Sequence, residues 1–355
     1  MSNYIAQNVA ALDAYTPGEQ PQECGIIKLN TNENPYPPSP QVTAALAAFS
    51  AERLRLYPDP RAMALRRRVA EIHACRVEQV FVGNGSDEIL ALTTRAFVEN
   101  DGRIGYFTPS YSLYPVLADI RGASRCPVEL GPDFAWRMPA DVRASLFLLT
   151  TPNAPTAIQY DRGLVTAFCR GFNGVVLLDE AYADFAPDNF MDLALAPANT
   201  NTLVMRTFSK SFSLAGLRLG YVIGPEPLIA AIDKIKDSYN LDMLTQTVGL
   251  AALNDLPHMR GNVCRIQATR GRLTEALRAR GYHVLPSATN FLFARPPDGN
   301  ARAVFDRLRE QKIFVRYFPG PRTGEFLRIT VGTDVEIDAL LAALGHDSQI
   351  KKETV

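Results

Sequence analysis

The chain has 355 residues, and its 37 Lys and Arg residues balance its 37 Asp and Glu residues. This balance provides no basic surface for a polyanion, so we expect no nucleic-acid partner. The sequence shows neither a basic start followed by an apolar run nor an apolar stretch of about 18 residues, so we expect a cytoplasmic protein that does not bind a membrane. A chain of this length can build a full core and is expected to form two lobes.

The cysteines and histidines indicate neither a metal site nor disulfide bonds. The cysteines form no C-x-x-C pair, and the histidines have no metal-ligand spacing. We therefore expect reduced thiols and no metal. The residues concerned are Cys24, Cys75, Cys126, Cys169, Cys264, His73, His258, His283 and His346.

Helical and strand patterns alternate from residue 60 onward, after a Pro-rich stretch over residues 35–40 that predicts an extended arm. Strands are expected near residues 80–82, 104–107, 146–149, 175–178 and 203–205. This alternation predicts a largely parallel sheet with helices on both faces. A mostly helical stretch over residues 225–281 then links to a second lobe, with strands near 290–293 and 326–331 and helices after residues 300 and 334.

An anion-binding turn is predicted at residues 83–86 (Gly-Asn-Gly-Ser), where a helix over residues 86–98 begins with Ser86 as its N-cap. Free backbone N–H groups and the helix dipole favour an anion there. In the dinucleotide pattern G-x-G-x-x-G the third glycine falls on Glu88, whose charge would repel a pyrophosphate. The turn therefore argues against a nicotinamide cofactor, and a capped helix without a ligand remains the alternative.

A second polar position follows residues 174–178 (Gly-Val-Val-Leu-Leu), an apolar run typical of a buried parallel strand. Asp179 comes directly after it, where open α/β sheets bind ligands. A buried aspartate facing a pyridine nitrogen would keep that nitrogen protonated, and Tyr182 could donate to a phenolic oxygen of the same ring. Taken alone, Asp179 would more simply be a helix cap or half of an ion pair.

Residues 207–220 (TFSKSFSLAGLRLG) place Lys210 among hydroxyls and small residues. Desolvation lowers the pKa of a lysine and makes its amine a usable nucleophile. Ser209 and Arg218 add a hydroxyl and a fork of N–H donors that suit a phosphate. Together with Asp179, a reactive amine beside a phosphate clamp matches the aldehyde, ring and phosphate of pyridoxal 5′-phosphate.

The order of these motifs resembles that of the fold-type I pyridoxal-phosphate aminotransferases, and most of all the histidinol-phosphate aminotransferase family. The similarity extends from residues 29–35 (LNTNENP) to residues 327–332 (LRITVG). Between them lie, in register, residues 57–60 (YPDP), 83–88 (GNGSDE), 109–111 (PSY), 179–182 (DEAY) and 209–210 (SK). A series of motifs in one order makes the cofactor class specific, whereas one short motif would not.

The resemblance implies an α/β fold with a large domain over residues 41–250, built on a mostly parallel seven-stranded sheet flanked by helices. It also implies a smaller α+β domain over residues 251–355, joined by an N-terminal arm over residues 1–40. A homodimer with shared active sites is implied as well. In it, Tyr57 would reach the cofactor phosphate of the partner subunit, with plain interface packing as the alternative for this ring.

Site residues are likewise implied by the resemblance. The catalytic residues would be Lys210, Asp179 and Tyr182. The cofactor would also contact Gly85, Ser86, Asp87, Ser209, Arg218 and Tyr57, with Tyr111 stacked on its ring. Arg316 and Arg328 would face the anionic end of the substrate. Tyr15 and Tyr239 would line the substrate site, although packing explains these two tyrosines nearly as well.

One segment departs from the family pattern. Similar enzymes read Asn-Asn-Pro-Thr-Gly, whereas this chain has Asn-Ala-Pro-Thr-Ala over residues 153–157. Ala154 lacks the amide that donates to the phenolic oxygen of the cofactor in those enzymes, a loss of ~1.5–3 kcal/mol unless Tyr182, Asn153 or a water replaces it. We expect Ala157 to avoid the positive φ that glycine adopts easily, and the turn to differ slightly.

The resemblance implies that the chain converts L-histidinol phosphate and 2-oxoglutarate to imidazole acetol phosphate and glutamate, in histidine biosynthesis. Lys210 would move a proton between substrate and cofactor as general base and acid. Three alternatives stay open: a threonine-phosphate decarboxylase, a broad aromatic amino-acid aminotransferase, and a non-catalytic pyridoxal-phosphate-binding regulator. The regulator would need a DNA-binding segment, and no basic stretch supplies one.

Overall fold

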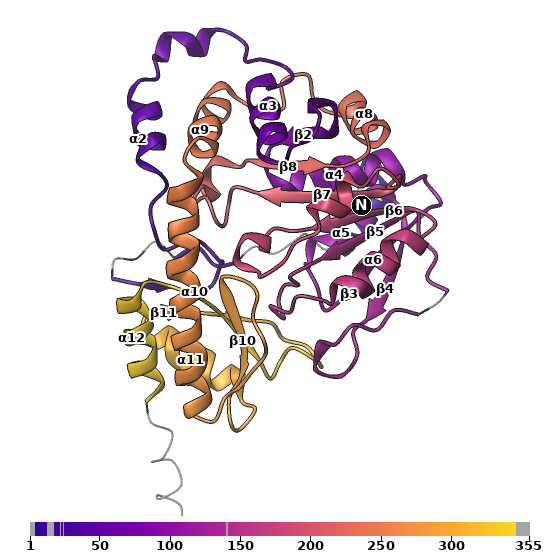
Figure 1. The fold of residues 1–355 in the computed structure, drawn as a ribbon. Coiled ribbons are helices and arrows are strands. Elements are labelled where there is room, and N and C mark those ends of the chain that lie inside the picture. Colours follow the sequence, from indigo (N-terminus) through magenta and orange to yellow (C-terminus); the bar gives the residue numbers. More distant parts are fainter. Residues whose placement is uncertain (1–3, 13–17, 22, 24, 140, 346–355) are drawn as a thin grey trace, which may run out of the picture.

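The computed structural model describes the chain except for residues 1–3, 13–17, 22, 24, 140 and 346–355. Two lobes are visible, one around a large sheet and one around a small sheet, with the long helix α10 (Leu256–Ala279) running from the first toward the second (Figure 1). None of the helices in the described part of the chain is long and apolar enough to cross a membrane.

The large sheet is mixed and mostly parallel, with strand order β2-β8-β7-β6-β5-β3-β4. Its strands are β2 (Val80–Gly83), β3 (Arg103–Thr108), β4 (Ser124–Glu129), β5 (Leu146–Thr150), β6 (Val175–Asp179), β7 (Thr202–Thr207) and β8 (Gly220–Ile223). Strand β8 runs antiparallel to both of its neighbours, β2 and β7, and the other pairings in this sheet are parallel. The predicted fold class is confirmed, but the sequence pattern indicates neither β4 nor β8.

Both faces of this sheet are buried under helices (Figure 1). Side chains of β5 alternate between two hydrophobic clusters: Leu146 and Leu148 belong to one, Phe147 and Leu149 to the other. This two-sided burial explains why the strands read as continuous apolar runs. The helices of the lobe are α2 (Pro40–Ala47), α3 (Met63–Ile72), α4 (Gly85–Phe97), α5 (Leu113–Arg121), α6 (Arg162–Gly171), α7 (Met191–Leu195), α8 (Glu226–Ile235) and α9 (Met243–Leu253).

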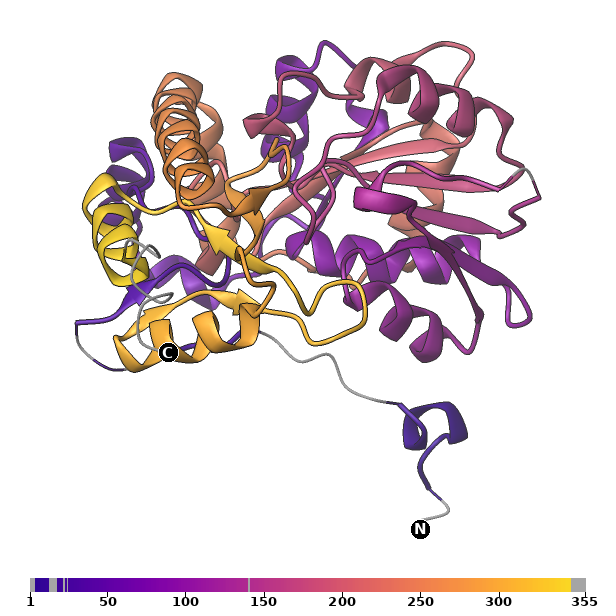
Figure 2. The ribbon, with the colours of Figure 1, turned by 90° about the horizontal axis from the view of Figure 1, so that it is seen from below.

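The small lobe contains an antiparallel sheet of order β12-β13-β10-β9. Its strands are β9 (His283–Val284), β10 (Phe291–Arg295), β12 (Arg316–Tyr317) and β13 (Leu327–Thr330), and its helices are α11 (Ala301–Glu310) and α12 (Asp334–Leu344). The N-terminal segment joins this lobe because β1 (Ile27–Lys28) pairs in parallel with β11 (Ile313–Phe314), as Figure 2 shows from below. The remaining short helix α1 (Gln7–Ala10) is tied to α5 by Asn8, which donates to the Asp119 carbonyl. The domain boundary near residue 250 stays a prediction.

Short 3-10 helices complete the chain at η1 (Ala51–Arg55), η2 (Val77–Gln79), η3 (Pro132–Phe134), η4 (Ala183–Phe185) and η5 (Ala215–Leu217). Two of them, η4 and η5, lie in the segments that follow β6 and β7 and that carry the predicted site residues Tyr182, Ser209 and Lys210. These segments place polar groups at the carboxyl edge of the sheet, within reach of a ligand.

Two local predictions are wrong. Ser86 is not the N-cap of α4: the helix runs from Gly85 with Asn84 as its N-cap, and Gly85 takes a φ of +79°, which glycine adopts without strain. The Asn84 N–H is bound instead by the Glu88 carboxylate, at 2.5 Å. Ala157 does adopt a positive φ, of +67°, because its N–H donates to the Asn153 carbonyl at 2.8 Å and its carbonyl accepts from the Ala288 N–H at 2.9 Å.

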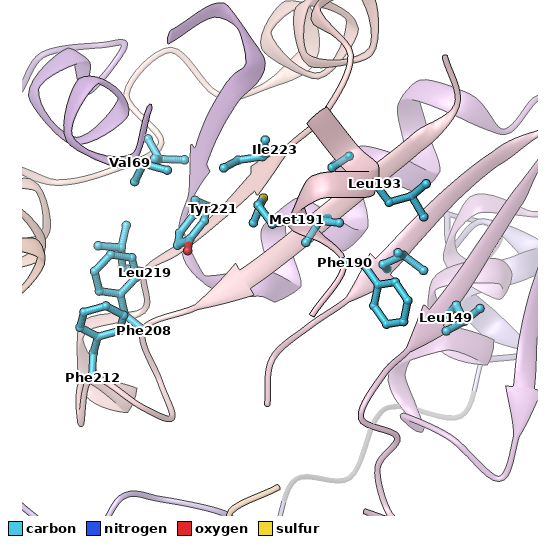
Figure 3. Close-up of a cluster of buried hydrophobic side chains, with 14 of the residues drawn as sticks. Val69, Leu149, Phe190, Met191, Leu193, Phe208, Phe212, Leu219, Tyr221 and Ile223 are labelled. Atoms are coloured by element: carbon cyan, nitrogen blue, oxygen red, sulfur yellow. The ribbon is translucent and has the colours of Figure 1, made fainter. Parts of the chain in front are cut away.

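A buried aromatic pair anchors the loop after β7. The rings of Phe208 and Phe212 are stacked, with centroids 4.7 Å apart, beside Leu219 and Tyr221 (Figure 3). These rings lie two residues to either side of Lys210. The lysine backbone is therefore held against the core of the large lobe, and its side chain extends from a fixed base.

Candidate active site

A cavity of about 420 Å³ lies at the carboxyl edge of the large sheet, facing the small lobe. It brings together most residues predicted from the sequence, namely Ser86, Asp87, Tyr111, Asp179, Tyr182, Ser209, Lys210, Arg218, Arg316 and Arg328. Its wall also includes Thr31, Asn32, Thr150, Ala154 and Thr207. Thr150, Asp179 and Thr207 end three neighbouring strands, which is where open α/β sheets bind ligands.

Asp179 is a buried carboxylate with two fixed donors. Its Oδ2 accepts from the Tyr114 hydroxyl at 2.9 Å, and its Oδ1 accepts from the Ala181 N–H at 3.1 Å. Burial raises the pKa of Asp179 to about 6, and the two hydrogen bonds oppose that rise. A cationic ring nitrogen in the cavity would favour the charged form again.

Lys210 extends into the same cavity. Its Nζ lies 3.3 Å from the Thr31 carbonyl oxygen and 5.9 Å from the ring centroid of Tyr182. Burial, helped by the nearby charges of Arg328 and Arg218 and opposed by those of Glu33 and Asp87, lowers the pKa of Lys210 to about 8. A larger share of this amine is therefore neutral near pH 7 than for an exposed lysine, as a nucleophile requires.

An anion cradle forms where α4 begins. Arg218 has a φ of +55°, and its guanidinium donates to Ser209 Oγ at 3.3 Å and to Asp87 Oδ2 at 3.2 Å. A Cβ on Gly85 would stand 2.8 Å from Arg218 Nη2 and would displace this guanidinium, and the φ of +79° at this position also favours glycine. Tyr111 closes the group by donating to Asp87 Oδ1 at 3.2 Å. The N–H groups of the helix start, the hydroxyl and the guanidinium suit a phosphate.

A second basic group comes from the small lobe. Arg316 and Arg328 are direct partners in the pairing of β12 with β13, and both line the cavity. Their guanidinium carbons lie 5.4 Å and 5.2 Å from the ring centroid of Phe318. Like charges directly opposite each other on a sheet are destabilising. An anionic ligand between them would remove that repulsion.

Two predicted site residues, Tyr57 and Tyr239, are not brought together with the cavity. Tyr57 and Tyr239 stack on each other with centroids 4.5 Å apart, and they are 78% and 45% exposed. Neither lines the cavity. Tyr15 lies outside the described residues.

Sequence reasoning missed Tyr114 and Asn32. Tyr114 holds Asp179, and the Asn32 amide donates to the Tyr182 hydroxyl at 2.9 Å. Asn32 lies in the segment 29–35 that carries the family resemblance, and this was the available signal for it. Nothing near Tyr114 in the sequence singles it out.

The structure also shows that Asn153 does not replace the amide missing at Ala154. The Asn153 side chain is fully buried and donates to the Pro109 carbonyl at 3.1 Å and to Thr156 Oγ1 at 3.0 Å. Its Oδ1 accepts from Ser110 Oγ at 2.8 Å. This side chain therefore holds the loop together, while Ala154 lines the cavity without a side-chain donor.

Comparisons with known proteins agree with this geometry. The family model described as aminotransferase class I and II matches residues 25–344. A histidinol-phosphate aminotransferase of Microcystis aeruginosa is 42% identical, covering 93% of this chain and 94% of its own. A histidinol-phosphate aminotransferase 1 of Bradyrhizobium diazoefficiens is 45% identical, covering 97% and 99%.

Among solved structures, a histidinol-phosphate aminotransferase of Sinorhizobium meliloti in complex with pyridoxal 5′-phosphate superposes with a TM-score of 0.87. It is 26% identical and covers 97% of each chain. An aspartate aminotransferase variant of Thermus thermophilus, 19% identical, has the same fold with a TM-score of 0.80. The chain therefore belongs to the class I and II aminotransferases and, among them, to the histidinol-phosphate aminotransferase family.

Proposed function

We propose that this enzyme binds pyridoxal 5′-phosphate and transfers the amino group of L-histidinol phosphate to 2-oxoglutarate. One observation carries the proposal. A single cavity holds a lysine of lowered pKa together with two separate arginine groups, Arg218 in the large lobe and the pair Arg316 and Arg328 in the small lobe. A phosphorylated cofactor and a phosphorylated substrate need one such group each.

The residues present fit the cofactor. When bound, it supplies an aldehyde that exchanges amino groups and a ring that accepts electrons. Ser86, Ser209 and Arg218 would hold its phosphate. Tyr111 would cover one face of its ring, and Asp179 would keep the ring nitrogen protonated.

Lys210 is the proposed nucleophile and proton carrier. Its amine would bond the cofactor. Once the substrate displaces this amine, it would take a proton from the substrate carbon and deliver that proton to the cofactor. The pKa of about 8 suits both directions near neutral pH. Tyr182 would donate its hydroxyl hydrogen to the phenolic oxygen of the cofactor, close to this amine.

Substrate recognition is assigned to Arg316 and Arg328. Two forked donors match a phosphate monoester, and an α-carboxylate would suit them equally well. The choice of histidinol phosphate therefore depends on the family to which the chain belongs. A cytoplasmic location stays a prediction.

A homodimer is part of the proposal. Exposed apolar side chains lie close in sequence to Tyr57, at Leu54 (57% exposed) and Leu56 (54% exposed). Such side chains on one segment are typical of an interface. In a dimer, the Tyr57–Tyr239 stack would reach the cavity of the partner subunit. This would explain why the stack lies away from the cavity of its own subunit.

A half-reaction panel tests the function. Histidinol phosphate, phenylalanine, aspartate and threonine phosphate are each mixed with the cofactor-loaded enzyme, and the cofactor absorbance is followed. We expect the fastest loss of the absorbance band with histidinol phosphate and an oxo product. Release of carbon dioxide from threonine phosphate would instead identify a decarboxylase, and a clear preference for aspartate would contradict the substrate assignment.

A further inference from the structure

We propose that Asn32 is a positioning residue that aims the Tyr182 hydroxyl at the phenolic oxygen of the cofactor, and that this pair replaces the donor missing at Ala154. The inference rests on the proposed cofactor. It assigns to the N-terminal segment a role in tuning the cofactor's charge.

The orientation of the Asn32 amide is fixed by its other contacts. Asn32 Oδ1 accepts from the Thr330 hydroxyl at 3.2 Å, while the Asn32 backbone N–H donates to the same hydroxyl at 3.0 Å. The Asn32 carbonyl accepts from Asn290 Nδ2 at 3.0 Å. The amide nitrogen is therefore the atom that faces Tyr182, and it can only donate.

A phenol oxygen that accepts a hydrogen bond from Asn32 cannot donate its own hydrogen to that amide. The Tyr182 hydrogen must therefore point elsewhere, and Tyr182 lines the cavity. The Tyr182 ring packs edge-to-face against the Phe291 ring, with centroids 5.0 Å apart and an interplanar angle of 83°. Asn32 thus fixes the direction of one O–H group whose position is already set by packing.

Because Ala154 has no side-chain amide, the phenolic oxygen of the cofactor needs a donor from another residue. Ala154 and Tyr182 belong to the same buried cluster, and both line the cavity. The Asn153 side chain is committed to the loop and supplies no donor there. The Tyr182 phenol lines the cavity together with Ala154 and can supply a donor there.

The backbone of Asn32 is in the left-handed region, with a φ of +56°, which is unfavourable for most residues other than glycine. Asparagine tolerates this region better than other non-glycine residues, and glycine adopts it freely. The variant Asn32→Gly therefore deletes the amide while keeping the backbone conformation, which makes it the right test of the side chain.

The test uses the full-length enzyme loaded with cofactor, and measures the pH midpoint of the cofactor absorbance and the cofactor dissociation constant. Losing a donor to the phenolic oxygen disfavours the form that has lost a proton, so Tyr182→Phe is expected to raise the midpoint by about one pH unit. Asn32→Gly should raise it by a substantial part of that shift. The double variant should match Tyr182→Phe alone, because Asn32 acts through the phenol.

Rescue separates positioning from folding. Adding Ala154→Asn to Asn32→Gly should return the midpoint toward the wild-type value, which a general loss of structure would not allow. A midpoint that moves in Tyr182→Phe but stays unchanged in Asn32→Gly would overturn the inference. Wild-type enzyme that binds no pyridoxal phosphate at Lys210 would instead overturn the proposed function.

Discussion

The hydroxyl of Tyr114 donates a hydrogen bond of 2.9 Å to Oδ2 of Asp179, and both side chains are buried behind the cavity. This bond favours the charged carboxylate. Tyr114→Phe is therefore expected to raise the pKa of Asp179 further and to weaken its hold on a protonated pyridine. A bond to a charged group is worth ~1.5–3 kcal/mol, so we expect a loss of cofactor affinity of roughly 10-fold or more.

Tyr160→Phe is the matched control for this prediction. The Tyr160 hydroxyl is buried and has no hydrogen-bond partner in the part of the chain that the structure describes. Removing it should leave cofactor affinity unchanged. Equal losses in the two variants, measured by titration of the apoenzyme with cofactor, would contradict the role given to Tyr114.

Asp179 makes the stability of the cofactor-free enzyme depend on pH. Its pKa is about 6 in the folded protein, against an ordinary value of 3.8 for an exposed aspartate, so the folded state favours the protonated form. This group therefore destabilises the fold above pH 6 and ceases to do so as the pH falls toward 4. We expect apo Asp179→Asn to be more stable than apo wild type at pH 8 by up to about 3 kcal/mol, with no advantage at pH 4. Urea unfolding at both pH values measures this, and a difference independent of pH would refute it.

The ion-pair network behind the cavity is expected to be essential for stability. Arg206 contacts Glu180 and Asp184, each at 2.8 Å, and Glu180 is fully buried. Arg206→Met would leave an unpaired buried carboxylate, so we expect a loss of about 3–5 kcal/mol in the free energy of unfolding. Adding Glu180→Gln should recover part of this loss.

The exposed pair Arg302–Asp306 provides a control on the surface of the small lobe. Arg302→Met should change stability far less than Arg206→Met, since exposed ion pairs contribute little. If Arg206→Met were equally mild, the buried network would have no structural importance. Chemical denaturation of the apoproteins compares the two sites directly.

Substitutions of Lys210 and Arg328 are expected to impair different steps of the reaction. Lys210→Ala should abolish turnover, because no other amine in the described wall of the cavity can replace it. Arg328→Ala should raise KM for histidinol phosphate and leave single-turnover chemistry at saturating substrate largely intact. Equal loss of that chemistry in both variants would contradict this division of roles.

The sequence predicts those site residues that lie in short motifs or next to strand ends. Lys210, Asp179 and the turn at Gly85 stand next to strand ends and in short motifs, so their chemistry can be inferred from neighbours. Tyr114 and Asn32 reach the site from 65 and 150 residues away in the chain, and no local pattern indicates such contacts. Only the tertiary fold brings them into place.

The two local errors have the same origin. The φ of Ala157 is fixed by hydrogen bonds to Asn153 and to Ala288, the second of which lies in another part of the chain. The start of α4 is fixed by Glu88, which binds the Asn84 N–H. Intrinsic preferences of alanine and serine were outweighed by these contacts. The strand β8 was missed because it begins at Gly220, the last residue of the lysine segment, and its four residues end before Gly224 and Pro225, which read as a turn.

The most direct test of the account is to find the residue that carries the cofactor. Wild-type enzyme saturated with pyridoxal 5′-phosphate is treated with borohydride, digested and mapped by peptide mass spectrometry. We expect one modified lysine, Lys210, and no modification in Lys210→Ala. A saturated enzyme with Lys210 unmodified, or with the cofactor fixed on another lysine, would contradict it.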